Sequence, residues 1–242
     1  MNMINDKNSR GVLYIASGFE HIKAALQSAQ SVRNTNPGLL IHLFADWQQQ
    51  KFQLDIDPGP LTSWENIPEP HRRSKVDYIA RTPFEQTLYL DTDTRVLCDL
   101  GDLFALLEKF DVALAHAHKR EIPNKQKKVK IQTPNAFPQF NSGVFLFKRN
   151  EKTINAFSLW RRWFYETNLS TDQNTLREIM WSSDLRIATL PPEYNVRFLK
   201  YMFLWSRDEA RPKILHLPYY RQGIMSYVKR WRKTILRKFK AA

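Results

Sequence analysis

Two apolar runs separated by a helical segment open the chain, and they restrict its fold more than any other feature. Residues 11–16 (GVLYIA) end in Ser17-Gly18, and residues 39–44 (LLIHLF) form the second run. Between them, apolar residues recur at three- and four-residue steps as far as residues 36–38 (NPG), which predicts an amphipathic helix. A strand, a helix and a strand with short connections form a βαβ unit with parallel strands. The sequence therefore predicts an α/β fold.

The remainder of the chain continues the alternation of strands and helices. Further strands are expected at residues 87–90, 111–115, 143–147 and 214–217. Helices are expected at residues 74–81, 102–109 and 154–167, and again from about residue 170. Residues 48–73, rich in proline, glutamine and charge, are expected to be irregular. A chain of 242 residues can bury one sizeable core, so we expect residues 1–223 to form a single domain.

The net charge of +13 is concentrated at the C-terminus. Seven basic residues lie in residues 224–242, and no acidic residue follows Glu209. Apolar residues at positions 224, 228, 231, 235 and 239 share one face of a helix. This pattern is typical of an amphipathic helix that binds an anionic membrane surface in a salt-sensitive way, although a solvated tail has the same composition.

The cysteine content and the first residues indicate the cellular compartment in which the protein is expected. A single cysteine, Cys98, excludes an intramolecular disulfide framework, and no Cys/His spacing indicates structural zinc. The polar start lacks the apolar run of a secretory signal, and no stretch approaches the roughly 20 apolar residues of a membrane span. We therefore expect a cytoplasmic protein that can lie on the inner face of a membrane through residues 224–242.

Two aspartates stand directly after the strand expected at residues 87–90. Ligands in open α/β sheets bind beyond the carboxyl ends of strands. Side chains two residues apart in an extended segment point the same way, so Asp91 and Asp93 can converge on one divalent cation that also takes phosphate oxygens. The aspartates can also be simple turn formers. Phosphatases of the haloacid dehalogenase type place a D-x-D motif after a strand as well, but with Thr or Val where this chain has Arg95.

Further blocks follow the aspartates in a fixed order. Residues 75–97 include YIA and TLYLDTDTRVL, and later come FNSGV at 140–144, DQ at 172–173, LPPEYN at 190–195 and KILH at 213–216. These blocks resemble those of GT-A glycosyltransferases, most closely glycosyltransferase family 8, the group of glycogenin and the bacterial lipopolysaccharide galactosyltransferases. The resemblance covers residues 11–216. It implies a GT-A catalytic domain, with a Rossmann-like mixed, mainly parallel sheet flanked by helices.

The resemblance also implies a reaction and residues that carry it. The reaction is metal-dependent transfer of a sugar from a nucleotide-diphosphate sugar, by default a UDP-sugar, to a glycan or lipid-linked acceptor with retention of configuration. Asp91, Asp93 and His216 would bind Mn²⁺ or Mg²⁺, and manganese suits a site in which imidazole joins two carboxylates. The donor would contact Ala16, Ser17, Lys75, Thr92 and Arg221, the last in place of a lysine that the family carries after its histidine. The transferred sugar would contact the catalytic candidates Asn141, Asp172 and Gln173.

Each block, taken alone, also fits a simpler role. Residues 170–173 (STDQ) fit the capping box of a helix N-terminus, and His216 can be a buried core histidine. The basic composition fits a nucleic-acid-binding protein, but no RRM, KH or zinc-finger signature accompanies it. The aspartate pair also fits a sugar nucleotidyltransferase, whose glycine-rich N-terminal loop is absent here. Together the ordered blocks favour the glycosyltransferase, and we expect no nucleic-acid partner.

Overall fold

A computed structural model describes residues 9–47, 59–118, 129–200, 204–206, 208–218 and 220. Arg221 and the basic segment at residues 224–242 lie outside these described residues. The donor contact expected for Arg221, the membrane contact expected for the basic segment and the domain boundary at residue 223 therefore stay predictions. None of the helices in the described part of the chain is long and apolar enough to cross a membrane.

Strands and helices alternate along most of the chain. The strands are β1 (Arg10–Ala16), β2 (Leu40–Ala45), β3 (Ser63–Asn66), β4 (Gln86–Leu90), β5 (Thr94–Val96), β6 (Val112–His116), β7 (Phe140–Lys148), β8 (Ile187–Leu190) and β9 (Ile214–His216). The α-helices are α1 (Phe19–Thr35), α3 (Lys75–Tyr78), α4 (Gly101–Ala105), α5 (Glu151–Thr167) and α6 (Gln173–Ser182). Short 3₁₀ turns occupy Ile79–Arg81, Leu106–Glu108 and Pro192–Tyr194.

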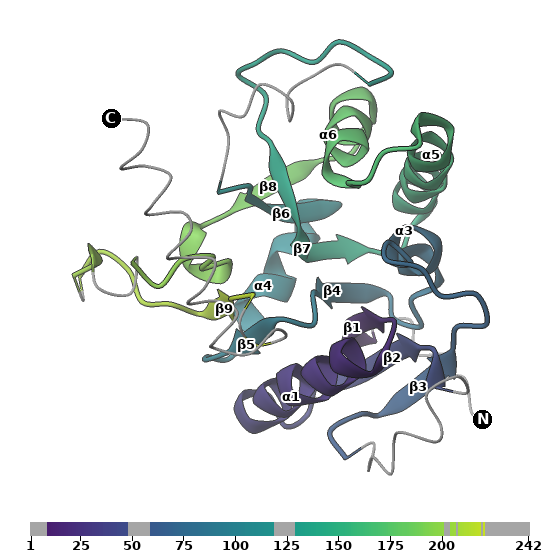
Figure 1. Ribbon diagram of the computed structural model, residues 1–242. Coiled ribbons are helices and arrows are strands. Elements are labelled where there is room, and N and C mark those ends of the chain that lie inside the picture. The colour runs from purple at the N-terminus through teal and green to yellow at the C-terminus, as the bar shows by residue number, and fades with distance from the viewer. Residues whose placement is uncertain are drawn as a thin grey trace, which may run out of the picture.

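Seven of the strands form one central sheet in the order β3-β2-β1-β4-β7-β6-β8 (Figure 1). Strand β1 is parallel to both β2 and β4, as the βαβ unit requires. Strand β7 is antiparallel to its neighbours β4 and β6, whereas β6 and β8 are parallel. The prediction of a mixed, mainly parallel sheet flanked by helices is confirmed.

Helices cover both faces of this sheet because successive residues of a strand point to opposite sides. Val12 and Tyr14 of β1 pack in one core with the apolar face of α1, and Leu13 and Ile15 pack in the other with α5 and α6. Figure 1 shows α1 beside β1 and β2, and α5 beside α6 over the other half of the sheet. Burial on both faces explains why these strands are continuous apolar runs.

The two edge strands of the sheet differ from what the sequence predicted. Strand β3 lies within the segment expected to be irregular, and β8 was not predicted at all. Both are four residues long, and β3 (SWEN) has no residue that is fully buried. Three starting points also shift: β7 begins at Phe140 rather than Gly143, α5 at Glu151 rather than Ile154, and α6 at Gln173 rather than near residue 170.

A separate antiparallel pair, β5 with β9, brings distant parts of the chain to the carboxyl end of β4. Strand β5 starts directly after Asp93, and β9 ends at His216. In the register of this pair, Thr94 lies opposite His216. The Leu217 N–H donates to the Asp93 carbonyl oxygen at 2.9 Å, which fixes the chain after β9 against the turn after β4. The pairing of β5 with β9 thus places a histidine beside the two aspartates.

Candidate active site

The turn that carries the two aspartates is held by backbone and hydroxyl contacts. The Asp91 N–H donates to the carbonyl oxygen of Gly143 in β7 at 2.8 Å. The Thr94 hydroxyl donates to the Asp91 carbonyl oxygen at 2.8 Å. With its backbone fixed on both sides, the side chain of Asp91 leaves the end of β4 in a defined direction.

Asp91, Asp93 and His216 converge as one potential metal site. Each offers a ligand atom, and the three atoms lie within 4.8 Å of one another. His216 Nε2 is 3.1 Å from Asp93 Oδ1 and 3.5 Å from Asp91 Oδ2. The proximity of these three side chains agrees with the ligand set that the family resemblance implied.

The surroundings of His216 fit a metal ligand better than a satisfied core histidine. Its Nδ1 lies 2.8 Å from Asn195 Oδ1, an atom that only accepts, so Nδ1 carries a proton. Its Nε2 is buried and forms no hydrogen bond with any residue that the structure describes. Metal-bound histidines are commonly fixed in this way through the other ring nitrogen.

Glycine at position 143 leaves the space that this cluster needs. A Cβ built on Gly143 would lie 2.5 Å from Asp91 Oδ2 and would collide with Cε1 of His216. The backbone of β7 therefore approaches two of the three candidate ligands more closely than any side chain would allow.

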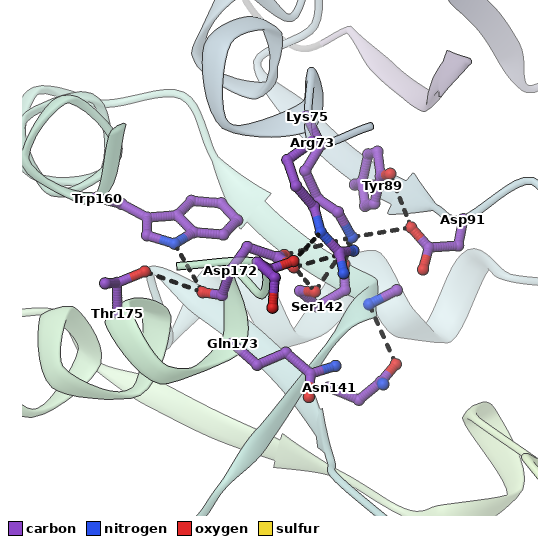
Figure 2. Close-up of polar contacts among 12 residues, drawn as sticks. Arg73, Lys75, Tyr89, Asp91, Asn141, Ser142, Trp160, Asp172, Gln173 and Thr175 are labelled. Carbon is purple, nitrogen blue, oxygen red and sulfur yellow. Dashed lines mark hydrogen bonds and ion pairs between the residues drawn. The ribbon is translucent and has the colours of Figure 1, made fainter. Parts of the chain in front are cut away.

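Lys75 joins the potential metal site to a second buried carboxylate (Figure 2). Its Nζ is 3.0 Å from Asp91 Oδ1 and 3.6 Å from Asp172 Oδ2, and it donates to the hydroxyl of Ser142 at 3.1 Å. Burial lowers the pKa of Lys75, but the charges of Asp172 and Asp91 outweigh that effect and raise it above its usual value. The ammonium group therefore stays charged between the two carboxylates.

Asp172 is buried, and both its carboxylate and its carbonyl oxygen accept contacts from neighbouring side chains. Ser142 Oγ donates to Oδ2 at 2.8 Å, and Arg73 Nη1 lies 3.2 Å from Oδ1. Its carbonyl oxygen accepts from Trp160 Nε1 at 3.1 Å. The capping box expected over residues 170–173 is wrong, because helix α6 begins at Gln173 and its N-cap residue, Asp172, makes no side-chain capping bond. Its carboxylate faces the cluster of Lys75 and Arg73 instead, as Figure 2 shows.

The pair of aspartates remains ionised in this environment. Burial acts to raise the pKa of Asp91, but Lys75 and then His216 outweigh it and hold that pKa well below its usual range. For Asp93, burial is again outweighed, mainly by His216, which leaves a pKa of about 2. Burial, followed by the charge of Asp91, raises the pKa of Tyr89 well above its usual value, so its hydroxyl keeps the proton that it donates to Asp91 Oδ1 at 2.8 Å.

Five of the predicted residues line a cavity of about 100 Å³, whereas Asn141, Gln173 and His216 are not among its lining residues. Its lining includes Ser17, Lys75, Asp91, Thr92 and Asp93. Ala16 lies buried at the end of β1 and is not among the lining residues. Asn141 is buried, with Oδ1 accepting from the Gly143 N–H at 3.1 Å, and Gln173 begins α6.

Three residues of this cluster were not singled out from the sequence. Arg73 precedes Lys75 in a run of basic residues, HRRSK at 71–75, which was the available signal. Tyr89 and Ser142 stood inside the matching blocks, but nothing in their spacing indicated that they bind Asp91 and Asp172. Figure 2 shows all three directed at the two carboxylates.

Comparison with protein families decides the class. The sequence profile of glycosyl transferase family 8 matches residues 71–233, well over half of the chain and the part that includes Asp91, Asp172 and His216. The chain belongs to glycosyl transferase family 8. It is a glycosyltransferase. Membership of this family favours sugar transfer over the alternatives of a nucleotidyltransferase, a phosphatase or a nucleic-acid-binding protein.

Solved structures show that this glycosyltransferase has the GT-A fold. The galactosyltransferase LgtC, in complex with donor and acceptor sugar analogs, superposes with a TM-score of 0.61 at 14% identity, over 86% of this chain and 87% of LgtC. The glycosyltransferase GlyE of Streptococcus pneumoniae TIGR4 gives 0.57 at 22% identity, over 86% of this chain and 55% of GlyE. Mouse xyloside xylosyltransferase 1 superposes with a TM-score of 0.57 at 11% identity, over 86% of this chain and 97% of the mouse protein. Curated proteins give no match.

Proposed function

We propose that this enzyme transfers a sugar from a nucleotide-diphosphate sugar, in the first instance a UDP-sugar, to a glycan acceptor in a reaction that needs Mn²⁺ or Mg²⁺. The observation that carries the proposal is the convergence of Asp91, Asp93 and His216, whose potential ligand atoms lie within 4.8 Å of one another and are joined to Asp172 through Lys75. A cation held by these three ligands would neutralise the diphosphate and the charge that grows on it as it leaves. The imidazole in the ligand set favours manganese over magnesium.

The formal charges of the cluster support binding of an anion only together with a cation. Asp91, Asp93 and Asp172 carry three negative charges, and Arg73 and Lys75 carry two positive ones. The cluster is therefore negative overall and would repel a diphosphate. A bound divalent cation makes the net charge of the cluster positive, so we expect the metal and the donor to bind together.

Asp172 is suited to holding the transferred sugar rather than to forming a bond with it. Two cations and a hydroxyl already contact its carboxylate, and such contacts stabilise the charged form and reduce its reactivity as a nucleophile. We propose that Asp172, with Gln173 and Asn141, orients the sugar while the nucleoside diphosphate departs. Retention of anomeric configuration is part of the proposal.

A thermal-shift panel tests the donor and the metal together. The wild type is heated with the diphosphates of uridine, guanosine, adenosine and cytidine, each with and without Mn²⁺. We expect one nucleotide to stabilise the protein only with metal, by about 2.7 kcal/mol at about 100 times its Kd. Asp93→Ala should lose the effect. Stabilisation that is independent of metal, or that survives Asp93→Ala, would refute the proposed site.

We propose that the acceptor binds in a larger cavity next to the metal site. This cavity, of about 430 Å³, lies between the ends of β6 and β8 and is lined by His116, His118, Thr189 and Pro191 among others. Asn195 lines it as well and binds Nδ1 of His216, so the cavity and the potential metal site share a wall. Imidazoles and prolines offer both polar and flat apolar contacts, which suit a sugar ring.

Filling the larger cavity is expected to block transfer and spare donor hydrolysis. Thr189 is exposed in β8 and lines the cavity, so Thr189→Trp adds bulk without burying a polar group. Transfer to a panel of aryl glycosides should fall at least about tenfold, because small displacements of an acceptor cost large factors in rate. Hydrolysis of the donor by water should persist. Thr189→Val is the matched control, and transfer by Thr189→Trp at the wild-type rate would place the acceptor elsewhere.

A further inference from the structure

The cavity that contains Asp91 and Asp93 has one wall of consecutive residues, HRRSK at 71–75. Two of its cations are engaged with carboxylates: Arg73 with Asp172, and Lys75 with Asp91 and Asp172. Arg72 differs from them. Its side chain is exposed at the cavity, and it forms no hydrogen bond or ion pair with any residue in the described ranges.

The backbone around Arg72 is fixed although its side chain is not engaged. The His71 N–H donates to Ser74 Oγ at 2.8 Å, and that hydroxyl donates to the His71 carbonyl oxygen at 2.7 Å. The His71 ring is held in turn, with Nε2 2.5 Å from Asp77 Oδ2 and Nδ1 accepting from the Arg73 N–H at 3.2 Å. Arg72 therefore starts from an ordered turn, which lowers the entropic cost of placing its guanidinium on a ligand.

When this cluster holds both a divalent ion and a diphosphate, one more positive charge is needed for neutrality. With a divalent ion bound, the cluster of Asp91, Asp93, Asp172, Arg73 and Lys75 has one net positive charge. The diphosphate of a donor brings two negative charges, and the nucleoside diphosphate that leaves brings about three. The shortage of positive charge is thus largest after the bond between the diphosphate and the sugar has broken. A planar guanidinium is well matched to two phosphate oxygens.

We propose that Arg72 binds the diphosphate of the donor and, more tightly, the departing nucleoside diphosphate. This inference rests on the proposed function, because it requires a nucleotide-diphosphate sugar as substrate. It assigns the charge-balancing role to the one guanidinium of the wall at residues 71–75 that no described residue engages. Arg73 and Lys75 remain with Asp172 and Asp91 throughout.

Calorimetry with matched nucleotides tests the role of Arg72. UDP and UMP are titrated into wild type, Arg72→Gln and Arg72→Lys with saturating Mn²⁺, or the corresponding pair of another base if the panel selects one. We expect Arg72→Gln to weaken UDP binding about tenfold, the value of one charge-assisted hydrogen bond, and UMP binding far less. Arg72→Lys, which keeps the charge and loses the planar fork, should fall between. The unfolding temperature without ligand should not change.

Arg149→Gln is the matched control. Arg149 is also exposed and pairs only loosely with Glu85, 3.8 Å away, at the end of β4 opposite to Asp91. The Arg149→Gln variant should bind UDP and UMP with the affinities of the wild type. Unchanged UDP affinity in Arg72→Gln, or an equal loss for UDP and UMP, would overturn the inference. A wild type that binds no nucleoside diphosphate with Mn²⁺ would instead refute the proposed function, so the two failures can be told apart.

Discussion

Gly143→Ala should remove metal-dependent activity and leave the fold in place. The added Cβ would meet Asp91 Oδ2 at 2.5 Å, Asp91 Cγ at 2.9 Å and the ring of His216, so both candidate ligands must move. The colliding atoms belong to side chains, and Gly143 is not among the residues with a positive φ, so the strand itself is not strained. A displacement of about 1 Å in a catalytic constellation can cost about 100-fold in rate.

The rate of donor hydrolysis with Mn²⁺ measures this effect, and we expect it to fall at least about 100-fold. Gly38→Ala provides the control, because a Cβ at Gly38 would meet nothing within 4 Å. Its activity should match that of the wild type. Wild-type turnover and wild-type Mn²⁺ affinity in Gly143→Ala would show that Asp91 and His216 do not act as a pair of ligands.

Asp172→Asn is expected to lower both stability and activity. The change leaves Arg73 without its carboxylate partner and Lys75, whose side chain is 8% exposed, with Asp91 alone. Removing one partner of a buried ion pair typically costs about 3–5 kcal/mol. The side chain of Arg73 is 24% exposed to water, so we expect a loss of stability at the lower end of this range, about 3 kcal/mol.

For a chain of this length, a loss of about 3 kcal/mol should lower the unfolding temperature by about 6–12 °C. Sugar transfer should fall by at least about 100-fold at a temperature where the variant is folded. Calorimetric unfolding and a transfer assay measure the two effects separately. Asp184→Asn, at an exposed aspartate beyond α6, should show neither. An unchanged unfolding temperature in Asp172→Asn would mean that the carboxylate is not the counter-charge of Arg73 and Lys75.

The inner strands of the sheet were readable from the sequence because both of their faces are buried. Residues 11–16 and 39–44 had to be apolar throughout, and apolar runs between turn signals are the strongest local evidence for such strands. The edge strands β3 and β8 have a sheet neighbour on one side only, and they are partly exposed. Their pairing is specified by the backbone of β2 and β6, so their own sequences did not need to carry the pattern.

The three candidate metal ligands were named from the sequence, but the contacts that connect them to their neighbours were not. Asp91 and Asp93 follow a strand, and the resemblance supplied His216. The contact of Lys75 with both Asp91 and Asp172 joins residues 16 and 97 positions apart. Arg73, the residue that completes this network, follows no fixed spacing from its partner Asp172. Such contacts arise where α3 packs near the carboxyl end of β4 and the first residues of β7, and no local pattern encodes that packing.

A titration of Mn²⁺ into the metal-free enzyme with UDP present, followed by electron paramagnetic resonance, is the most direct test of the three-ligand site. We expect a single ion to bind the wild type and Asp184→Asn equally, and Asp93→Asn and His216→Gln to bind it at least about 100-fold more weakly. Full Mn²⁺ binding in either of the last two variants would contradict the site formed by Asp91, Asp93 and His216.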